Sequence, residues 1–135
     1  MLYLAIDLGQ KRTGLAVGTD VTRQAQPLRV VEVSDDQHRL NAIGQAIEEY
    51  GPAALVLGLP LNMDASEGPM ARQARRFAGL LAERFGLPVY LVDERLSSEA
   101  ADSAMSQSGL THAQKQSRRD ALAAATILRD FFQRQ

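Results

Sequence analysis

Short apolar runs alternate with amphipathic stretches along this chain, and the pattern predicts an α/β fold. The runs that predict strands are residues 2–6, 15–17, 28–33, 54–58 and 89–92. Three of them precede the first amphipathic stretch, and the other two alternate with helices. We therefore expect a mixed sheet of three leading strands, followed by alternating helices and parallel strands, with helices on both faces. The runs 2–6, 54–58 and 89–92 are apolar throughout, as expected for buried strands.

Helical spacing of apolar residues predicts three main helices with recognisable ends. The first follows a capping-box pattern, Ser34-x-x-Gln37, and stops at Gly51. The others span residues 70–85, before Gly86, and roughly residues 118–132. Between these two, Ser97 or Ser98 begins a shorter helix that Gly109 closes, and a polar connection covers residues 111–117.

The first predicted strand ends in an acid, Asp7, which is followed by a short polar turn between Gly9 and Gly14. The next apolar run then returns as an antiparallel strand. Alternation along a strand places Asp7 on the same face as Tyr3 and Ala5. An acid that only opens a turn gives the same local pattern, so this segment alone leaves both interpretations open.

Further acids occur where the predicted fold brings the ends of strands and a helix together. Asp93 and Glu94 end the last strand and point to opposite faces, and the pattern does not decide which of them accompanies Asp7. Asp120 is in helical register with Ala124 and Ile127, which places it on the stripe that faces the sheet. A bare carboxylate there is costly to desolvate. The alternatives are a first-turn acid that is favoured by the helix dipole, or a partner of Arg118 or Arg119.

An all-oxygen site made of Asp7, Asp93 or Glu94, and Asp120 suits Mg²⁺ or Mn²⁺. Two such ions can activate a water and stabilise the leaving oxygen of a phosphodiester. Without cations the carboxylates would repel one another. The pattern therefore indicates metal-dependent chemistry on a phosphate ester.

Charge and composition limit the kinds of partner and of metal site that the protein can have. The net charge of −1 excludes a uniformly basic nucleic-acid clamp, and allows local basic groups such as Lys11 and Arg12. Without cysteine there is no thiolate metal site and no disulfide. No apolar run reaches the ~20 residues of a membrane span, so we expect a cytoplasmic protein that does not bind membranes.

Four sequence blocks together resemble the YqgF (RuvX) family. They are Asp7-Leu-Gly-x-Lys-Arg-x-Gly14-x-Ala-Val17, then Gly58-Leu-Pro-Leu-Asn-Met-Asp64 with Glu67-Gly-Pro69, then Asp93-Glu-Arg-Leu-Ser97, and Asp120-Ala-x-Ala-Ala124. The resemblance covers nearly the whole chain. It implies a single RNase H-like domain over residues 1–135, related to the RuvC resolvase. It also implies a nuclease that resolves Holliday junctions or matures pre-16S ribosomal RNA, with possible pre-ribosomal particles as partners.

Residue by residue, the resemblance implies catalytic and metal-binding acids at Asp7, Glu94 and Asp120. The substrate-binding candidates, from the resemblance and from the local basic clusters, are Lys11, Arg12, Asn62, Lys115, Arg118 and Arg119. Glu67 is a further contributor from the loop that holds Asn62. Ala65 departs from the pattern, because many members have glycine at that position of the loop.

Two other functions share parts of this pattern. A sugar-kinase or actin-type phosphotransferase also carries Asp-x-Gly in its first hairpin, but it needs two such domains to enclose ATP. A non-catalytic ribosome-assembly factor could bind rRNA on the same scaffold. A pure binder would gain from losing three negative charges beside phosphates, so the acids favour the nuclease.

Overall fold

The computed structural model describes residues 1–94 and 112–134, with the helical backbone alone for residues 112–119. Its strands are β1 (Leu2–Leu8), β2 (Thr13–Thr19), β3 (Gln24–Val31), β4 (Ala54–Leu59) and β5 (Val89–Asp93). Its helices are α1 (Asp36–Tyr50), α2 (Pro69–Phe85) and α4 (His112–Gln133). Within the described residues, strands and helices follow one another in the predicted order.

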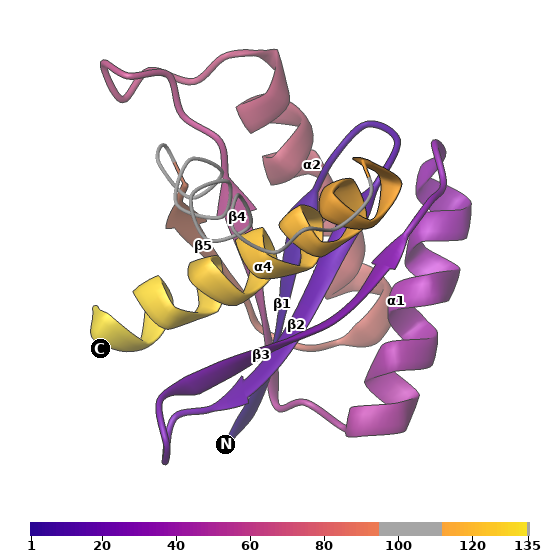
Figure 1. Cartoon of the computed structure of the whole chain (residues 1–135), viewed down its shortest axis with the longest axis vertical. Coiled ribbons are helices and arrows are strands. Elements are labelled where there is room, and N and C mark those ends of the chain that lie inside the picture. The colour runs from indigo at the N-terminus through magenta and orange to yellow at the C-terminus, as the bar shows by residue number, and fades with distance from the viewer. Residues whose placement is uncertain (95–111, 135) are drawn as a thin grey trace.

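The five strands form one mixed sheet in the order β3-β2-β1-β4-β5. β1 and β2 pair antiparallel, as do β2 and β3, whereas β4 runs parallel to β1 and β5 runs parallel to β4. The predicted mixed sheet is confirmed. Because β1, β4 and β5 are parallel, their carboxyl ends share one edge of the sheet, and β1 lies at its centre (Figure 1).

Each face of the sheet has its own core. One face packs against α1 and α2 through Leu4, Ile6, Leu15, Leu57, Ile43, Phe77 and Leu81. The other packs against α4, which crosses the strands in Figure 1, through Tyr3, Ala5, Ala16, Val56, Ala124, Ile127 and Phe132. Alternation along β1 thus divides its residues between the two cores, and it turns Asp7 toward α4 with Tyr3 and Ala5, as predicted.

The helix α4 lies very close to β2 because the strand has no side chain at Gly14. A Cβ atom at Gly14 would lie 2.0 Å from the backbone oxygen of Asp120, which is far inside van der Waals contact. Small residues continue this close contact at Ala16 on β2 and Ala124 on α4, both fully buried. The absence of a side chain at Gly14 therefore sets how closely Asp120 approaches the end of β1.

The predicted start of the last helix is wrong, because α4 begins at His112 and not near Arg118. Residues 112–117 are polar but contain neither glycine nor proline, and the apolar period starts only at Ala121. Apolar spacing cannot detect helical turns that lack an apolar stripe. Asp120 is thus the ninth residue of the helix, which removes the first-turn explanation for its acidity.

The other helix ends confirm most of the predictions. α1 and α2 stop at Gly51 and Gly86, which adopt left-handed φ angles of 61° and 65°. The N-cap of α1 is Asp35 and not Ser34, because the Asp35 carboxylate accepts the backbone N–H of His38 at 3.1 Å. The short helix predicted between Ser97 or Ser98 and Gly109 lies outside the described residues.

Two strand predictions need correction at the margins of the sheet. β3 begins at Gln24 and includes Pro27, which a ladder tolerates at an edge and opposite the irregular register between Leu15 and Ala16. β5 is mostly half-buried, with Val92 buried and Tyr90 exposed, because it is the last strand of the described sheet. No helix among residues 1–94 and 112–134 is long and apolar enough to cross a bilayer.

Candidate active site

Three acidic side chains lie on the α4 face of the sheet, near the carboxyl ends of the parallel strands. Asp7 belongs to the end of β1, Glu94 follows β5, and Asp120 comes from α4. Asp7 and Glu94 share a hydrogen bond, and the charge of Asp120 acts on Asp7. Asp93 lies one residue before Glu94 and alternates to the opposite face. The strand pattern left open whether Asp93 or Glu94 accompanies Asp7, and the structure places Glu94 there.

The Asp7–Glu94 pair is held where ionisation is costly. The pKa of Asp7 is raised from 3.8 to about 6, because burial and, to a smaller extent, the charge of Asp120 raise it more than the bond with Glu94 lowers it. Burial, the charge of Asp7 and the shared bond together raise the pKa of Glu94 from 4.5 to about 9. Two carboxyl groups in contact thus share a proton near neutral pH when no cation is present.

Gly58 of β4 provides the space that Glu94 occupies. A Cβ atom at Gly58 would lie 2.3 Å from Oε2 of Glu94 and 2.6 Å from Cδ1 of Ile127. Any larger residue at this position would push Glu94 away from Asp7. This close approach explains the glycine near the carboxyl end of an otherwise apolar strand.

The third acid, Asp120, is bonded to Arg12 across 108 positions of sequence. The Nε of Arg12 donates to Oδ2 of Asp120 at 2.9 Å, and the Asp120 side chain remains 21% exposed. The sequence named Arg118 or Arg119 as its partner, and their side chains lie outside the described residues. Arg12 is a partner that the sequence did not indicate. The turn after β1 therefore places the guanidinium of Arg12 against Asp120, the acid whose charge acts on Asp7.

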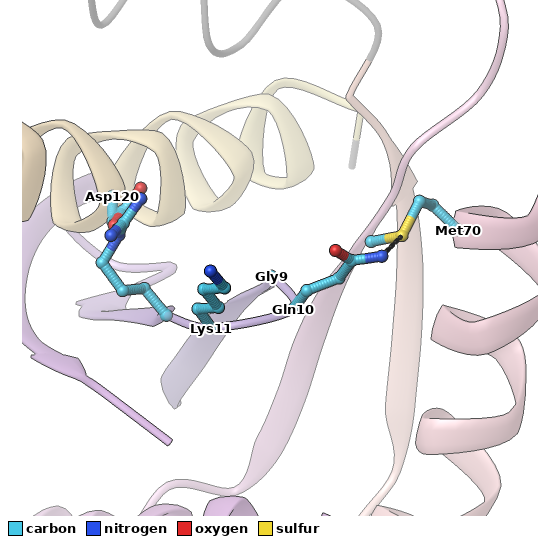
Figure 2. Close-up of a pocket in the computed structure, with 6 residues that line it drawn as sticks. Gly9, Gln10, Lys11, Met70 and Asp120 are labelled. Carbon is cyan, nitrogen blue, oxygen red and sulfur yellow. Dashed lines mark hydrogen bonds and ion pairs between the residues drawn. The ribbon is translucent and has the colours of Figure 1, made fainter. Parts of the chain in front are cut away.

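That turn, residues 9–12, forms one wall of an open pocket of about 470 Å³. Met70 of α2 and Asp120 of α4 complete the lining, and Figure 2 shows Lys11 between Asp120 and Gln10. The amide of Gln10 donates to the sulfur of Met70 at 3.7 Å, marked by the dashed line. A hollow with cationic groups beside a group of acids suits a phosphate backbone whose ester bond must approach the carboxylates.

The loop between β4 and α2 is held by its own polar side chains. Asn62 donates to Oγ of Ser66 at 3.0 Å, and Ser66 donates to the carboxylate of Asp64 at 2.6 Å. Glu67 forms two bonds with Arg75, both at 2.7 Å. Asn62 and Glu67 were predicted to contribute to the site, and their described bonds lie within this loop and the start of α2.

Ala65 in this loop adopts a left-handed backbone with φ of 70°, where many relatives were expected to carry glycine. We expect Ala65→Gly to raise the free energy of unfolding by about 1 kcal/mol, because the left-handed conformation costs an L-residue roughly 1–2 kcal/mol. Urea unfolding measures the change. The same substitution at the exposed helical residue Ala82 should instead destabilise by roughly 1 kcal/mol. A change in the free energy of unfolding of the same sign for both substitutions would contradict this interpretation.

Three predicted substrate-binding residues cannot be placed in the site. Lys115, Arg118 and Arg119 belong to the first turns of α4, whose side chains lie outside the described residues. Their roles stay predictions. A residue that the sequence analysis missed is Arg39 of α1, which is buried and bonded to the turn after Asp7. The available signal was a charge on the apolar stripe of a helix, in register with Ile43 and Ala46.

The donor set of Asp7 and Glu94 fits a hard divalent cation. Both groups offer only oxygen, and a cation between them would relieve the cost that raises their pKa values. Among the residues that the structure describes, however, no three or more acidic, histidine or cysteine side chains are gathered as a metal site. Asp120 accepts a bond from Arg12. The described geometry therefore fits a cation with two ligands, Asp7 at the end of β1 and Glu94 directly after β5.

The stability of the metal-free protein should fall as pH rises from about 4 to about 9. Both acids have a raised pKa in the folded state, so the folded protein binds protons that the unfolded chain releases in this range. Urea unfolding in EDTA at pH 5, 7 and 9 measures the trend. The double variant Asp7→Asn with Glu94→Gln should show a weaker decline. A stability that rises from pH 5 to 9 in the wild type would contradict the pair's shared proton.

Comparison with known sequences places the chain among nucleases. A family model described as "RuvX: Holliday junction resolvase" matches residues 1–134. A protein of Anaeromyxobacter sp. named "Putative pre-16S rRNA nuclease" is 47% identical over 128 residues, which are 95% of this chain and 93% of that protein. A relative of the same name from Thiobacillus denitrificans is 44% identical over 129 residues, covering 96% and 89%.

Solved structures with the same fold are junction-resolving enzymes. Thermus thermophilus RuvC in complex with a Holliday junction substrate matches with a TM-score of 0.63 and 22% identity, over 99% of this chain and 94% of that one. The Fowlpox virus Holliday junction resolvase matches with a TM-score of 0.59 and 12% identity over the full length of both chains. These similarities confirm the RNase H-like fold. The RuvC-like resolvases as a group generally depend on divalent metal.

Proposed function

The chain belongs to the RuvX family of nucleases, and from this membership we propose that residues 1–135 form a single metal-dependent endonuclease domain. Its substrate is structured nucleic acid, with the 5′ end of pre-16S rRNA as the first candidate and the Holliday junction as the second. Names of the relatives support the first substrate, and the family description supports the second. In this proposal the enzyme acts in the cytoplasm on pre-ribosomal particles.

The observation that carries the proposal is the Asp7–Glu94 pair with Asp120 within electrostatic reach. Asp7 and Glu94 would hold a divalent cation, and Asp120 would be the third acid of the site. The cation, when bound, activates a water and stabilises the charge that develops on the phosphate. Mg²⁺ and Mn²⁺ both suit oxygen ligands of this kind, and cleavage assays with each ion distinguish them.

The residues around the pocket would bind and orient the backbone. Lys11 and Arg12 stand in the turn beside the acids, and they would meet phosphates on the side of Asp120. Lys115, Arg118 and Arg119 would extend this contact from the start of α4, and Asn62 would border it from the loop after β4. Few and local contacts of this kind agree with a net charge of −1.

We expect Lys11→Ala to weaken binding of any substrate and to lower the salt dependence of affinity. Each lost phosphate contact lowers the slope of log affinity against log salt concentration by about one. The measurement is binding of a four-way DNA junction and of an RNA hairpin in EDTA at several salt concentrations. Arg84→Ala is the control, because Arg84 is an exposed residue at the far end of α2, bonded to Asn41. An unchanged slope for Lys11→Ala would show that this turn does not touch phosphate.

Side-by-side cleavage tests the proposed activity. A pre-16S rRNA fragment and a four-way DNA junction are incubated with wild type and with Glu94→Gln, each in Mg²⁺, Mn²⁺ or EDTA. Cleavage of either substrate by the wild type alone, and only with a cation, supports the nuclease. Equal cleavage by Glu94→Gln would overturn the assigned site.

A non-catalytic rRNA-binding role is the second candidate, and the Arg12–Asp120 ion pair is the observation that favours it. An acid that is neutralised by a neighbouring arginine repels phosphates less than a bare one. Tight binding of the rRNA fragment without cleavage in either cation would select this role over the nuclease.

A further inference from the structure

A buried arginine of α1 fastens the turn that follows Asp7. The side chain of Arg39 is only 2% exposed. Its Nη2 donates to the backbone oxygen of Gly9 at 3.0 Å and also to the backbone oxygen of Gln10. Its Nη1 donates to Oδ1 of Asp36 at 2.9 Å. One guanidinium thus connects the first turn of α1 to two successive carbonyl groups of the turn between β1 and β2.

Packing alone does not explain an arginine at this position. Arg39 shares the buried stripe of α1 with Leu40, Ile43 and Ala46. An apolar side chain there would fill the space without the cost of desolvating a charge. Moreover, Nε of Arg39 has no hydrogen-bond partner within the part of the chain that the structure describes. What arginine supplies that an apolar residue cannot is a guanidinium whose Nη2 binds two carbonyl oxygens of the turn while its Nη1 binds the carboxylate of Asp36.

The fastened turn is the one that presents the cationic groups of the pocket. Arg39 binds the backbone oxygens of Gly9 and Gln10. The next two residues, Lys11 and Arg12, line the pocket beside Asp120 (Figure 2). Arg12 reaches Asp120, whereas Lys11 has no carboxylate partner among the residues described. The position of both side chains depends on the path of the backbone through residues 9 and 10.

We propose that Arg39 is a positioning residue for substrate binding, which holds residues 9–12 so that Lys11 and Arg12 face the nucleic-acid backbone. This role rests on the proposed function, because it presumes a phosphate-bearing substrate in the pocket. Arg39 acts through the turn and does not touch the substrate. Its loss therefore changes binding and not the chemical step.

Arg39→Met removes the guanidinium and keeps an unbranched apolar side chain, and Arg84→Met makes the same charge change at an exposed site of α2. We expect Arg39→Met to raise KM with kcat nearly unchanged, as for a loss of uniform binding. In EDTA, its salt slope for the four-way junction and the RNA hairpin should fall by about one or two, as expected when Lys11 and Arg12 no longer meet phosphate. Arg84→Met should leave both quantities as in wild type.

A double-mutant cycle separates this role from a general structural one. If Arg39 acts through the turn, Lys11→Ala should cost much less affinity in the Arg39→Met background than in the wild type. Additive losses would overturn the proposal. Absence of any binding by the wild type would overturn the proposed function itself, which is a different result from additivity.

Hydrogen exchange at the backbone of residues 10–12 provides a measurement that needs no substrate. We expect faster exchange there in Arg39→Met and an intermediate rate in Arg39→Lys, whose one nitrogen cannot bind both the turn and Asp36 as Nη2 and Nη1 do. If Arg39→Met does not fold, Arg39→Lys replaces it in both the exchange measurement and the double-mutant cycle. If a folded variant shows the wild-type rate of backbone amide exchange at residues 10–12, Arg39 does not position these residues.

Discussion

Glu94→Gln is expected to abolish cleavage and to leave the metal-free protein at least as stable as the wild type. The amide keeps the size of Glu94 and its contact with Asp7, but it removes an oxygen ligand. Loss of several kcal/mol of electrostatic stabilisation corresponds to a decrease in rate of roughly 10³-fold or more. Because Glu94 has a pKa of about 9, it is already protonated near neutral pH, so the neutral amide costs the fold little.

Asp7→Asn should combine the same loss of activity with a gain in metal-free stability. The rise of the Asp7 pKa from 3.8 to about 6 corresponds to about 3 kcal/mol of unfavourable free energy at pH 8, which the amide does not carry. Cleavage assays and urea unfolding in EDTA measure the two quantities. Asp93→Asn is the matched control and should change neither, since Asp93 alternates to the other face. A clear loss of stability in Asp7→Asn would show that the acid serves the fold.

Gly14→Ala is expected to cost both stability and activity. The added methyl would lie 2.0 Å from the Asp120 backbone oxygen, and backbone atoms cannot swing aside as a side chain can. The helix α4 must therefore move away from β2, and we expect a loss of about 3 kcal/mol, at the upper end for overpacking. Since displacement by 1 Å can cost about 10²-fold in rate, cleavage should fall by a similar factor.

Gly79→Ala is the control for this substitution. Gly79 lies on the exposed side of α2, and a methyl there would meet no atom within 4 Å. The change should stabilise the protein by roughly 1 kcal/mol, because alanine is the better helix former. Thermal unfolding and cleavage rates of both variants provide the comparison. Wild-type activity in Gly14→Ala would mean that the position of Asp120 along β2 does not matter to the reaction.

Much of this arrangement could be predicted from apolar spacing because each element carries its own period. The alternation of Tyr3 and Ala5 with Leu4 and Ile6 placed Asp7 on the correct face, since alternation is a property of the strand itself. The register of Asp120 with Ala124 and Ile127 could be predicted in the same way, from the helix alone. The choice between Asp93 and Glu94 could not be predicted, because it depends on which face of β5 meets α4.

The contacts of arginine side chains could not be predicted, since they join segments distant in sequence. Arg12 meets Asp120 over a separation of 108 residues, and no pattern near either residue announces the pair. Arg39 is instructive for a different reason. Its place on the apolar stripe of α1 gave the same signal that drew attention to Asp120. A charge at a buried helical position is informative for either sign, and here the basic one marks the support of the turn.

The distance in sequence between the hairpin and α4 also bears on how the protein folds. β1 and β2 are joined by a short turn and can pair early, at a small entropic cost of closing the loop. α4 must dock onto them from more than a hundred residues away, a contact of high sequence separation that slows folding. The three acids therefore come together only when α4 has docked on the sheet. A chain in which only the hairpin has formed has no Asp120 beside Asp7, so the set of acids is incomplete until that contact forms.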